Sequence, residues 1–199
     1  MIDSPVKFSI DYPEKLSRGK LLLKTFFGWL YVGIPHGIIL IFYGVAVSVL
    51  TLIAWWVILF TGKYPKGMFN FVIRYWRWAI RVSAYLSLLT DAYPPFSGDE
   101  LDTPVKFLIE YPENLSRGKL LLKTFFGWLY VGIPHGIILI FYGIAVSVVT
   151  FIAWWVILFT AKYPKGMFNF VIRYWRWDIR VSAYLGLLTD AYPPFNGEE

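Results

Sequence analysis

Two stretches of this 199-residue chain, residues 37–61 and 136–160, each run for 25 positions without a charged side chain. A helix rises about 1.5 Å per residue, so about 20 apolar residues are enough to cross the hydrocarbon core of a bilayer. The first stretch ends close to Trp55 and Trp56, and such rings gather where a membrane meets water. The sequence therefore predicts an integral membrane protein with transmembrane helices over about 36–61 and 135–160.

The composition supports this class. Apolar residues make up 57% of the chain and charged residues 16%, whereas a soluble domain carries about 25% charged residues. Aromatic residues reach 21%, and there is no cysteine. The lack of cysteine excludes disulfides, thiolate zinc sites and cysteine nucleophiles.

The chain is an internal repeat. Residues 3–100 align with residues 102–199 without a gap, and twelve of the 98 aligned pairs differ. The prediction is two membrane units, 1–100 and 101–199, that arose by duplication and pack against each other. A duplication without structural partnership remains the alternative. Most of the differences are mild, and the most informative is Ala79, which becomes Asp178 in the second unit.

Each unit begins with a short segment that alternates apolar and polar residues between two prolines, over residues 5–13 and 104–112. This alternation is typical of a β-strand with one apolar face. A lone strand leaves its backbone unpaired. We expect it to pair with its own copy, another subunit or a partner protein, and an extended arm is the alternative. The apolar positions are Val6, Phe8, Ile10 and Tyr12, repeated as Val105, Phe107, Ile109 and Tyr111.

An interfacial helix is predicted next. Ser17 is suited to cap its N-terminus, and Lys20 and Lys24 share one face on which their amines can reach lipid headgroups. Residues 33–37 contain Pro35, which cannot donate a hydrogen bond and clashes with the preceding turn. We expect the helix to break or kink there.

A second amphipathic helix is predicted over about 66–89 and 165–188. Asn70, Arg74, Arg77 and Arg81 form a narrow polar stripe on an otherwise apolar and aromatic helix. Three arginines make a free crossing expensive, so this helix is expected to lie at the interface with its arginines on phosphates. The expected headgroup-binding residues are Lys20, Lys24, Arg74, Arg77 and Arg81, with Lys119, Lys123, Arg173, Arg176 and Arg180 in the second unit.

The fold class expected from these elements is an all-α integral membrane protein built as a tandem repeat. Its orientation is ambiguous, because basic residues flank the apolar stretch on both sides and the positive-inside rule needs an asymmetry. One crossing per unit would make the two units inverted repeats. A hairpin turning at residues 33–37 is the less favoured alternative, because its first leg is too short to cross.

Candidate contact sites between helices are few. Gly44 and Ser48, with Gly143 and Ser147, form small-xxx-small pairs that could allow close helix approach. Asp178 lies on the aromatic side of its helix, where a carboxylate would be costly in lipid. We expect this face of the second unit to meet protein, with a hydrogen-bond donor from another chain or from the first unit.

No catalytic constellation is visible. His36 and His135 have no acid or second histidine nearby in sequence, and a metal site needs several ligands. They are expected to bond a free carbonyl or a headgroup, while Asp91 and Asp190 suit helix-end or turn roles. No phosphate loop and no nucleophile–base–acid set occurs at a recognisable spacing. The chain is therefore expected to be non-enzymatic, without a cofactor or a metal.

Several longer strings carry a family resemblance: Ile58–Val72 (ILFTGKYPKGMFNFV), Arg77–Leu86 (RWAIRVSAYL), Leu89–Phe96 (LTDAYPPF) and the upstream Ile34–His36 (IPH). Together they resemble the bacterial membrane family known as domain of unknown function 4389, in both units. The resemblance implies a protein of the bacterial cytoplasmic membrane. It implies no established activity and no catalytic residues.

The function expected from these observations is that of a structural or accessory membrane protein. It would self-associate or serve as a subunit of a larger membrane complex and bind anionic lipid, since eight basic residues and no acid lie between Leu16 and Thr90. A transporter or channel subunit made of inverted repeats is the alternative. Nucleic acid is not an expected partner, because the basic groups lie beside membrane-length apolar stretches.

Overall fold

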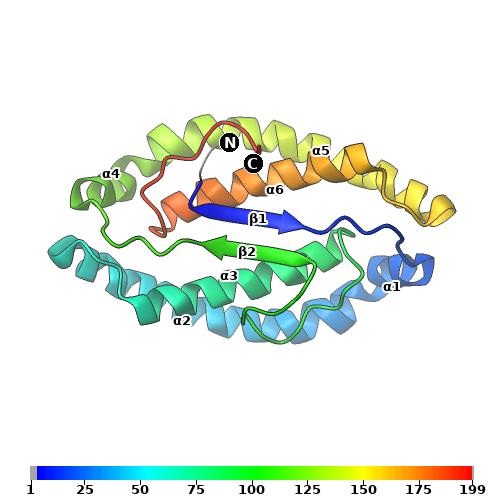
Figure 1. Cartoon of the computed structure of the whole chain (residues 1–199), viewed down its shortest axis with the longest axis horizontal. Helices are drawn as coiled ribbons and strands as arrows, with labels where there is room; N and C mark the ends of the chain where they lie inside the picture. The colour runs from blue at the N-terminus through cyan, green and yellow to red at the C-terminus, as the bar shows by residue number, and fades with distance from the viewer. Residues whose placement is uncertain (1–3, 199) are drawn as a thin grey trace.

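The structure, a computed structural model, describes residues 4–198 and shows two copies of one arrangement of helices (Figure 1). The first repeat contains β1 (Val6–Ile10), α1 (Arg18–Gly28), the π-helical turn η1 (Trp29–Gly33), α2 (Ile34–Thr61) and α3 (Lys66–Leu86). The second contains β2 (Val105–Ile109), α4 (Arg117–Gly127), η2 (Trp128–Gly132), α5 (Ile133–Thr160) and α6 (Lys165–Leu185). The prediction of a mostly helical chain with a twofold repeat is confirmed.

The two strands pair with each other, which is one of the outcomes expected from their sequence. They run antiparallel, with Phe8 opposite Phe107 at the centre of the register. The alternation of residue types places Val6, Phe8 and Ile10 on the buried face and leaves Lys7 exposed. The ribbon thus has an apolar side on the helices and a polar side facing outward.

Each strand packs against a helix of the other repeat. Strand β1 lies against α6, and β2 lies against α3. The ring of Phe8 stacks on Trp175 at a centroid distance of 6.0 Å, and Phe107 stacks on Trp76 at 6.1 Å. The repeats are therefore interlocked, because neither buries the apolar face of its strand on its own helices.

Helices α1 and α2 form one continuous rod over Arg18–Thr61, 44 residues long. Ser17 caps it as predicted, with its Oγ accepting from the Lys20 N–H at 3.3 Å. Of the expected break or kink near Pro35, the break does not occur, but the helix departs from α-helical geometry just before this residue. The turn η1 widens the helix so that the N–H of Ile34 bonds the carbonyl of Trp29, five residues back. Such a π-type turn lets the chain pass a residue that has no N–H without ending the helix.

The rod ends at a left-handed residue, Gly62, and α3 then runs back along α2. The Tyr43 hydroxyl donates to the carbonyl of Phe71 at 3.1 Å, and the Tyr43 ring meets those of Tyr75 and Trp78 edge-on. The predicted amphipathic helix over 66–89 is therefore present as α3, which ends at Leu86.

The two repeats also meet at both ends of the molecule, where α1 contacts α5 and α4 contacts α2. The Trp55 indole donates to Thr124 Oγ1, and the equivalent Trp154 indole donates to Thr25 Oγ1, each at 2.8 Å. Backbone hydrogen bonds also join the repeats at these two ends. The Leu16 N–H donates to the carbonyl of residue 161, and the Leu115 N–H donates to that of residue 62. The units thus form a structural pair and not merely a sequence duplication.

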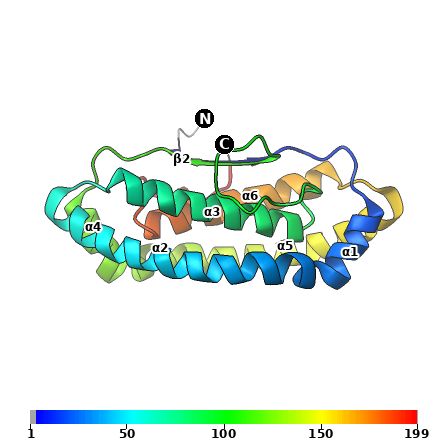
Figure 2. The same ribbon diagram turned by 90° about the horizontal axis from the view of Figure 1, so that it is seen from below.

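Seen from the side, the molecule has three layers (Figure 2). The strands form the upper layer, α3 and α6 the middle layer, and the two long rods the lower layer. Both rods are bowed, so that their ends rise toward the strand layer. In the view down the short axis the rods lie along the two long edges of the molecule (Figure 1).

The helix ends at residues 62 and 161 allow a matched stability test. Both residues are left-handed, with φ of 72° for Gly62 and 58° for Ala161. A left-handed alanine costs about 1 kcal/mol, because its Cβ approaches a carbonyl oxygen, whereas glycine adopts this conformation freely. We expect Gly62→Ala to lower the free energy of unfolding by about 1 kcal/mol and Ala161→Gly to raise it. Thermal unfolding in detergent, followed by circular dichroism, measures both, and a loss of stability in both variants would contradict the expectation.

Candidate functional site

The most extensive chemical feature is the apolar outer surface of the two rods, here named the apolar face. Its large side chains are exposed along the whole length of each rod; Phe42 is 73% exposed and Phe141 is 70% exposed. In the most apolar 18-residue window of the first rod only 6% of residues are buried, and in the second 17%. The core helix of a soluble protein would be mostly buried. By length and composition, both rods are helices that could cross a membrane. The main residues of the face are Phe26, Trp29, Ile38, Ile41, Phe42, Val45, Leu52, Trp56 and Phe60, and their equivalents in the second repeat.

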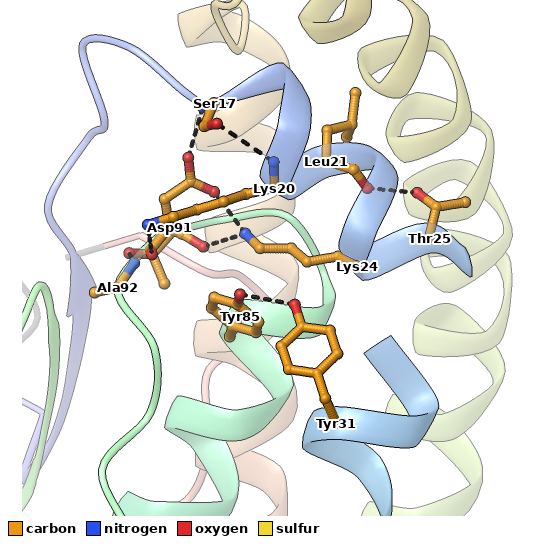
Figure 3. Close-up of polar contacts among 10 residues, drawn as sticks. Ser17, Lys20, Leu21, Lys24, Thr25, Tyr31, Tyr85, Asp91 and Ala92 are labelled. Atoms are coloured by element: carbon orange, nitrogen blue, oxygen red, sulfur yellow. Dashed lines mark hydrogen bonds and ion pairs between the residues drawn. The ribbon is translucent and has the colours of Figure 1, made fainter. Parts of the chain in front are cut away.

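Lys24, predicted to reach lipid headgroups, is instead buried between α1 and the segment that follows α3. Its Nζ lies 2.7 Å from Asp91 Oδ1 and 2.7 Å from the carbonyl of Thr90 (Figure 3). The same amine sits 4.1 Å from the ring centroid of Tyr85, whose hydroxyl bonds that of Tyr31 at 2.8 Å. The second repeat reproduces the cluster around Lys123 and Asp190. The amine is thus occupied within the protein.

Asp91 also fastens the beginning of α1. Its second oxygen accepts from the Ser17 N–H at 2.6 Å, and Lys20 donates from its side chain to the Asp91 carbonyl at 3.0 Å. This is the helix-end role that the sequence suggested. Lys20 itself remains exposed at the end of the rod.

The predicted arginine stripe divides in two. Arg74 is exposed and pairs with Asp99 at 2.5 Å, whereas Arg77 and Arg81 are 8% and 3% exposed. Arg77 donates to the carbonyls of Phe107 and Gly98, and Arg81 donates to that of Ser97. These guanidinium groups lie under the strands and the linker, not on the apolar face as a headgroup role would require.

The arginines of the second repeat make equivalent contacts. Arg176 bonds the carbonyl of Phe8 at 3.1 Å, and Arg180 bonds that of Glu198 at 2.8 Å, while Arg173 pairs with Glu198 at 3.2 Å. The Phe8 and Phe107 carbonyls need such donors, because the backbone bonds of the ribbon fall at the neighbouring pairs of residues. Arg77 and Arg176 therefore serve the ribbon edges, whereas Arg81 and Arg180 bond the segments that follow α3 and α6. Together with Lys7, Lys106 and Glu100 the four arginines line a hollow of about 760 Å³.

His36 is fully buried within a ring of aromatic residues. The Trp78 indole donates to its Nδ1 at 2.9 Å, so the proton of the neutral imidazole is on Nε2. That nitrogen faces the Tyr93 hydroxyl at 3.2 Å, and Tyr93 donates onward to the carbonyl of Tyr31. The ring of Phe96 stacks on the imidazole at 3.9 Å. His36 thus joins the long rod to the segment that follows α3, and His135 does the same after α6, with aromatic side chains as partners in place of the expected free carbonyl or headgroup.

The small residues of α2 contact their own repeat. A Cβ at Gly44 would lie 3.2 Å from the Tyr75 hydroxyl of α3, which fills this approach. Ser48 turns its hydroxyl back to the Gly44 carbonyl at 2.9 Å. Gly143 and Ser147 repeat this arrangement and also line a groove between α5 and α6.

Asp178 lies where two grooves meet. One, of about 440 Å³, separates α3 from α6, and Ala79 lies on its opposite wall beside Trp76. The other separates α5 from α6 and is also lined by Ile140 and Ile144 of the apolar face. The Asp178 side chain reaches the surface and forms no hydrogen bond with any residue in 4–198. Its predicted donor from the first repeat is therefore absent from the described residues. The apolar atoms behind the carboxylate withhold water, and this desolvation raises its pKa.

Within residues 4–198, no three histidine, cysteine, aspartate or glutamate side chains are placed to hold a metal ion. The polar groups that do gather are Lys24 with Asp91 and His36 with Tyr93, and sequence reasoning missed both pairs. The two residues of the first pair are 67 positions apart in the sequence, and those of the second pair are 57 positions apart. The available signal was that the strings IPH and LTDAYPPF recur in both repeats. The first string contains His36, and the second contains Tyr93 and Asp91. Both clusters are occupied by protein groups and fasten the segments of one repeat together.

The buried ion pair predicts a large stability effect at one lysine and a small one at its neighbour. Lys24→Met would leave the Asp91 carboxylate and the Thr90 carbonyl without their donor. We expect a loss of about 2–3 kcal/mol in the free energy of unfolding, between the values for buried and surface pairs. Lys20→Met, on the exposed amine four residues earlier, is the control and should change it by about 0.5 kcal/mol or less. Equal melting of the two variants in detergent would contradict this role of Lys24.

The raised pKa of Asp178 predicts that the stability of the fold depends on pH through this residue, whereas the equivalent Ala79 does not titrate. Because the folded state raises the pKa of Asp178, protonation favours folding, and stability rises as the pH falls through that value. Asp178→Ala should therefore melt above the unchanged chain at pH 8, with the difference shrinking toward pH 4. The matched control, Ala79→Asp, should lower the melting temperature at pH 8. A pH-independent difference for Asp178→Ala would contradict the assignment.

Comparison with known proteins identifies the family alone. The family model described as domain of unknown function (DUF4389) matches residues 23–98 and again residues 122–196. No curated protein matches the chain, and no solved structure matches it. The matched ranges contain both rods beyond their first turn, both amphipathic helices and both LTDAYPPF segments, but neither strand. The chain therefore belongs to the family of domain of unknown function 4389, of which it carries two tandem copies.

Proposed function

We propose that this chain is a non-enzymatic structural or accessory protein of a membrane, bound to lipid through the apolar face. The exposure of that face over the full length of both rods is the observation that carries the proposal. A monomeric soluble protein rarely exposes a continuous apolar patch of more than a few hundred Å². Acyl chains would cover such a surface without requiring polar partners from the rods.

The distribution of charge supports anionic lipid as the preferred neighbour. Exposed basic side chains lie at the ends of the rods, where Arg18 and Lys20 begin the first rod and Lys63 and Lys66 follow it. Basic groups beside an apolar surface gain about 1 kcal/mol each at an anionic membrane. Arg77, Arg81 and Lys24 are not part of this proposal, because each is buried and bonded within the protein.

The nature of the buried polar clusters supports a structural role over a catalytic one. The segment around Asp91 holds the start of the rod, and Tyr93 with Phe96 holds His36. Each polar group in these clusters is bonded to another protein group. A scaffold that presents its apolar face to lipid, and its strand side to further copies or partner subunits, needs this kind of fastening. We place it at the bacterial cytoplasmic membrane.

Flotation of the purified chain with vesicles tests the proposal. The protein should float with phosphatidylcholine vesicles and bind more tightly when a quarter of the lipid is phosphatidylglycerol, with the added affinity lost in high salt. The variant Phe42→Asp/Phe141→Asp places charges on the apolar face and should weaken binding at least tenfold. Leu108→Asp, on an exposed residue of the strand side, is the control and should bind as before.

The opposite result is equally clear. A chain that stays dispersed without detergent and does not float with either vesicle would contradict the proposal. Mass measurement in mild detergent tests the structural role separately. A larger assembly or a co-purifying subunit is expected, and a lone monomer in every detergent would oppose it.

A further inference from the structure

We propose that both rods lie parallel to the membrane plane, with the apolar face sunk into the acyl chains of a single leaflet, so that no segment of the chain crosses the bilayer. This inference rests on the proposed membrane association and specifies its geometry. It differs from the single crossing per repeat that the 25-residue uncharged stretches predict. The occupant of the apolar face is then one lipid leaflet.

The first argument is the length of the rod. A 44-residue helix is about 66 Å long, whereas the hydrocarbon core is about 30 Å thick. The exposed apolar side chains run from Leu22 to Phe60, which is about 57 Å at 1.5 Å per residue. Fitting them into the core of an upright molecule would need a tilt of about 60°, beyond the 0–40° seen for crossing helices. Lying flat, the whole length meets acyl chains.

The second argument is the position of the charges. The paired strands lie at the middle of the long axis (Figure 1), and their outer side carries ion pairs between Lys7 and Glu110 at 2.6 Å and between Lys106 and Asp11 at 3.1 Å. These four side chains are 53–59% exposed. In an upright molecule they would lie at the centre of the bilayer, where each charge costs about 2.5–3.5 kcal/mol on insertion scales. Lying flat, the molecule holds them in water.

The strand ribbon adds a backbone constraint to the same argument. A sheet of two strands has two outer edges, and open sheet edges do not occur where they face hydrocarbon. Arg77 and Arg176 satisfy the Phe107 and Phe8 carbonyls at these edges, which would then place two more cations at mid-membrane. The strand side is therefore a water-facing side.

The third argument is the bow of the rods. Their ends rise toward the strand layer in the side view (Figure 2). Arg18 and Lys63 lie at these ends, and the uncharged stretch of residues 37–61 occupies the lower part of the bow and its rise to one end. The middle of the apolar face would thus reach deepest, and the basic ends would rise to the phosphate level. This matches the way interfacial helices place apolar and basic groups.

This seating also accounts for a charge pattern that a crossing leaves unexplained. Basic residues flank each uncharged stretch on both sides, so the positive-inside rule selects no orientation for a crossing helix. When a rod lies flat, its two ends are on the same side of the membrane. Both sets of basic residues then face the same headgroups.

The sidedness of the two molecular ends tests the proposal. The chain has no cysteine, so Lys63→Cys and Lys162→Cys each introduce a single thiol at exposed, equivalent positions. These positions lie at opposite ends of the long axis, since Lys162 lies beside the start of α1. In intact spheroplasts, a membrane-impermeant maleimide should treat both variants alike: both label fully, or both label only after permeabilisation. Labelling of one variant only, or of each variant to about half, would mean that the two ends lie on opposite sides and would overturn the proposal.

The depth in the bilayer of residues near the middle of the molecule gives an independent test. An environment-sensitive dye on Phe42→Cys, near the centre of the first rod, should be quenched by brominated acyl chains in reconstituted vesicles. The same dye on Ser9→Cys, in the strand layer, should be quenched by aqueous iodide instead. In an upright molecule both positions would sit at similar depth, so lipid quenching of both would overturn the flat seating. Absence of flotation would refute membrane association itself, whereas flotation with opposite-sided ends refutes this inference alone.

Discussion

The arrangement of the whole molecule depends on the exchange of one strand between the repeats. Because β1 covers α6 and β2 covers α3, the side of each amphipathic helix that faces the strands is covered only when the two units are together. The ribbon then needs donors for the outward carbonyls of Phe8 and Phe107, and Arg176 and Arg77 supply them. Those arginines lie in the middle layer, below the strands. The charged groups of the molecule therefore gather on the strand side, and the outer surfaces of the long rods carry exposed apolar side chains.

Much of the local structure could be predicted because it is fixed by residues close in sequence. Ser17 begins the rod, residue 62 ends it, and the helix over 66–86 lies within the predicted amphipathic segment. The outcome near Pro35, where a break or a kink was expected and the helix continues, has a local cause as well. A proline removes one N–H but does not dictate how the helix responds, and here a π-type turn carries the helix past it.

What could not be predicted is where the polar side chains point, because that is decided by groups far away in the chain. A stripe of arginines on an apolar helix has the same pattern whether it faces phosphates or strand carbonyls. Lys24 likewise looks like an interfacial lysine until Asp91 is brought to it by the return of α3. The orientation of the apolar stretches is a third case. Their composition fits a crossing, whereas the length of the folded rod and the exposed ion pairs at the middle of the long axis give reasons to lay it flat.

The groove between α3 and α6 shows what covalent fusion permits. Ala79 and Asp178 occupy equivalent positions on its two walls. A symmetric dimer of single-unit chains would place any new side chain there twice, and two carboxylates would repel each other across the axis. Joining the units in one polypeptide lets one wall acquire a negative charge while the other keeps a methyl group. The fused protein can thus carry a lopsided surface that a symmetric homodimer could not display.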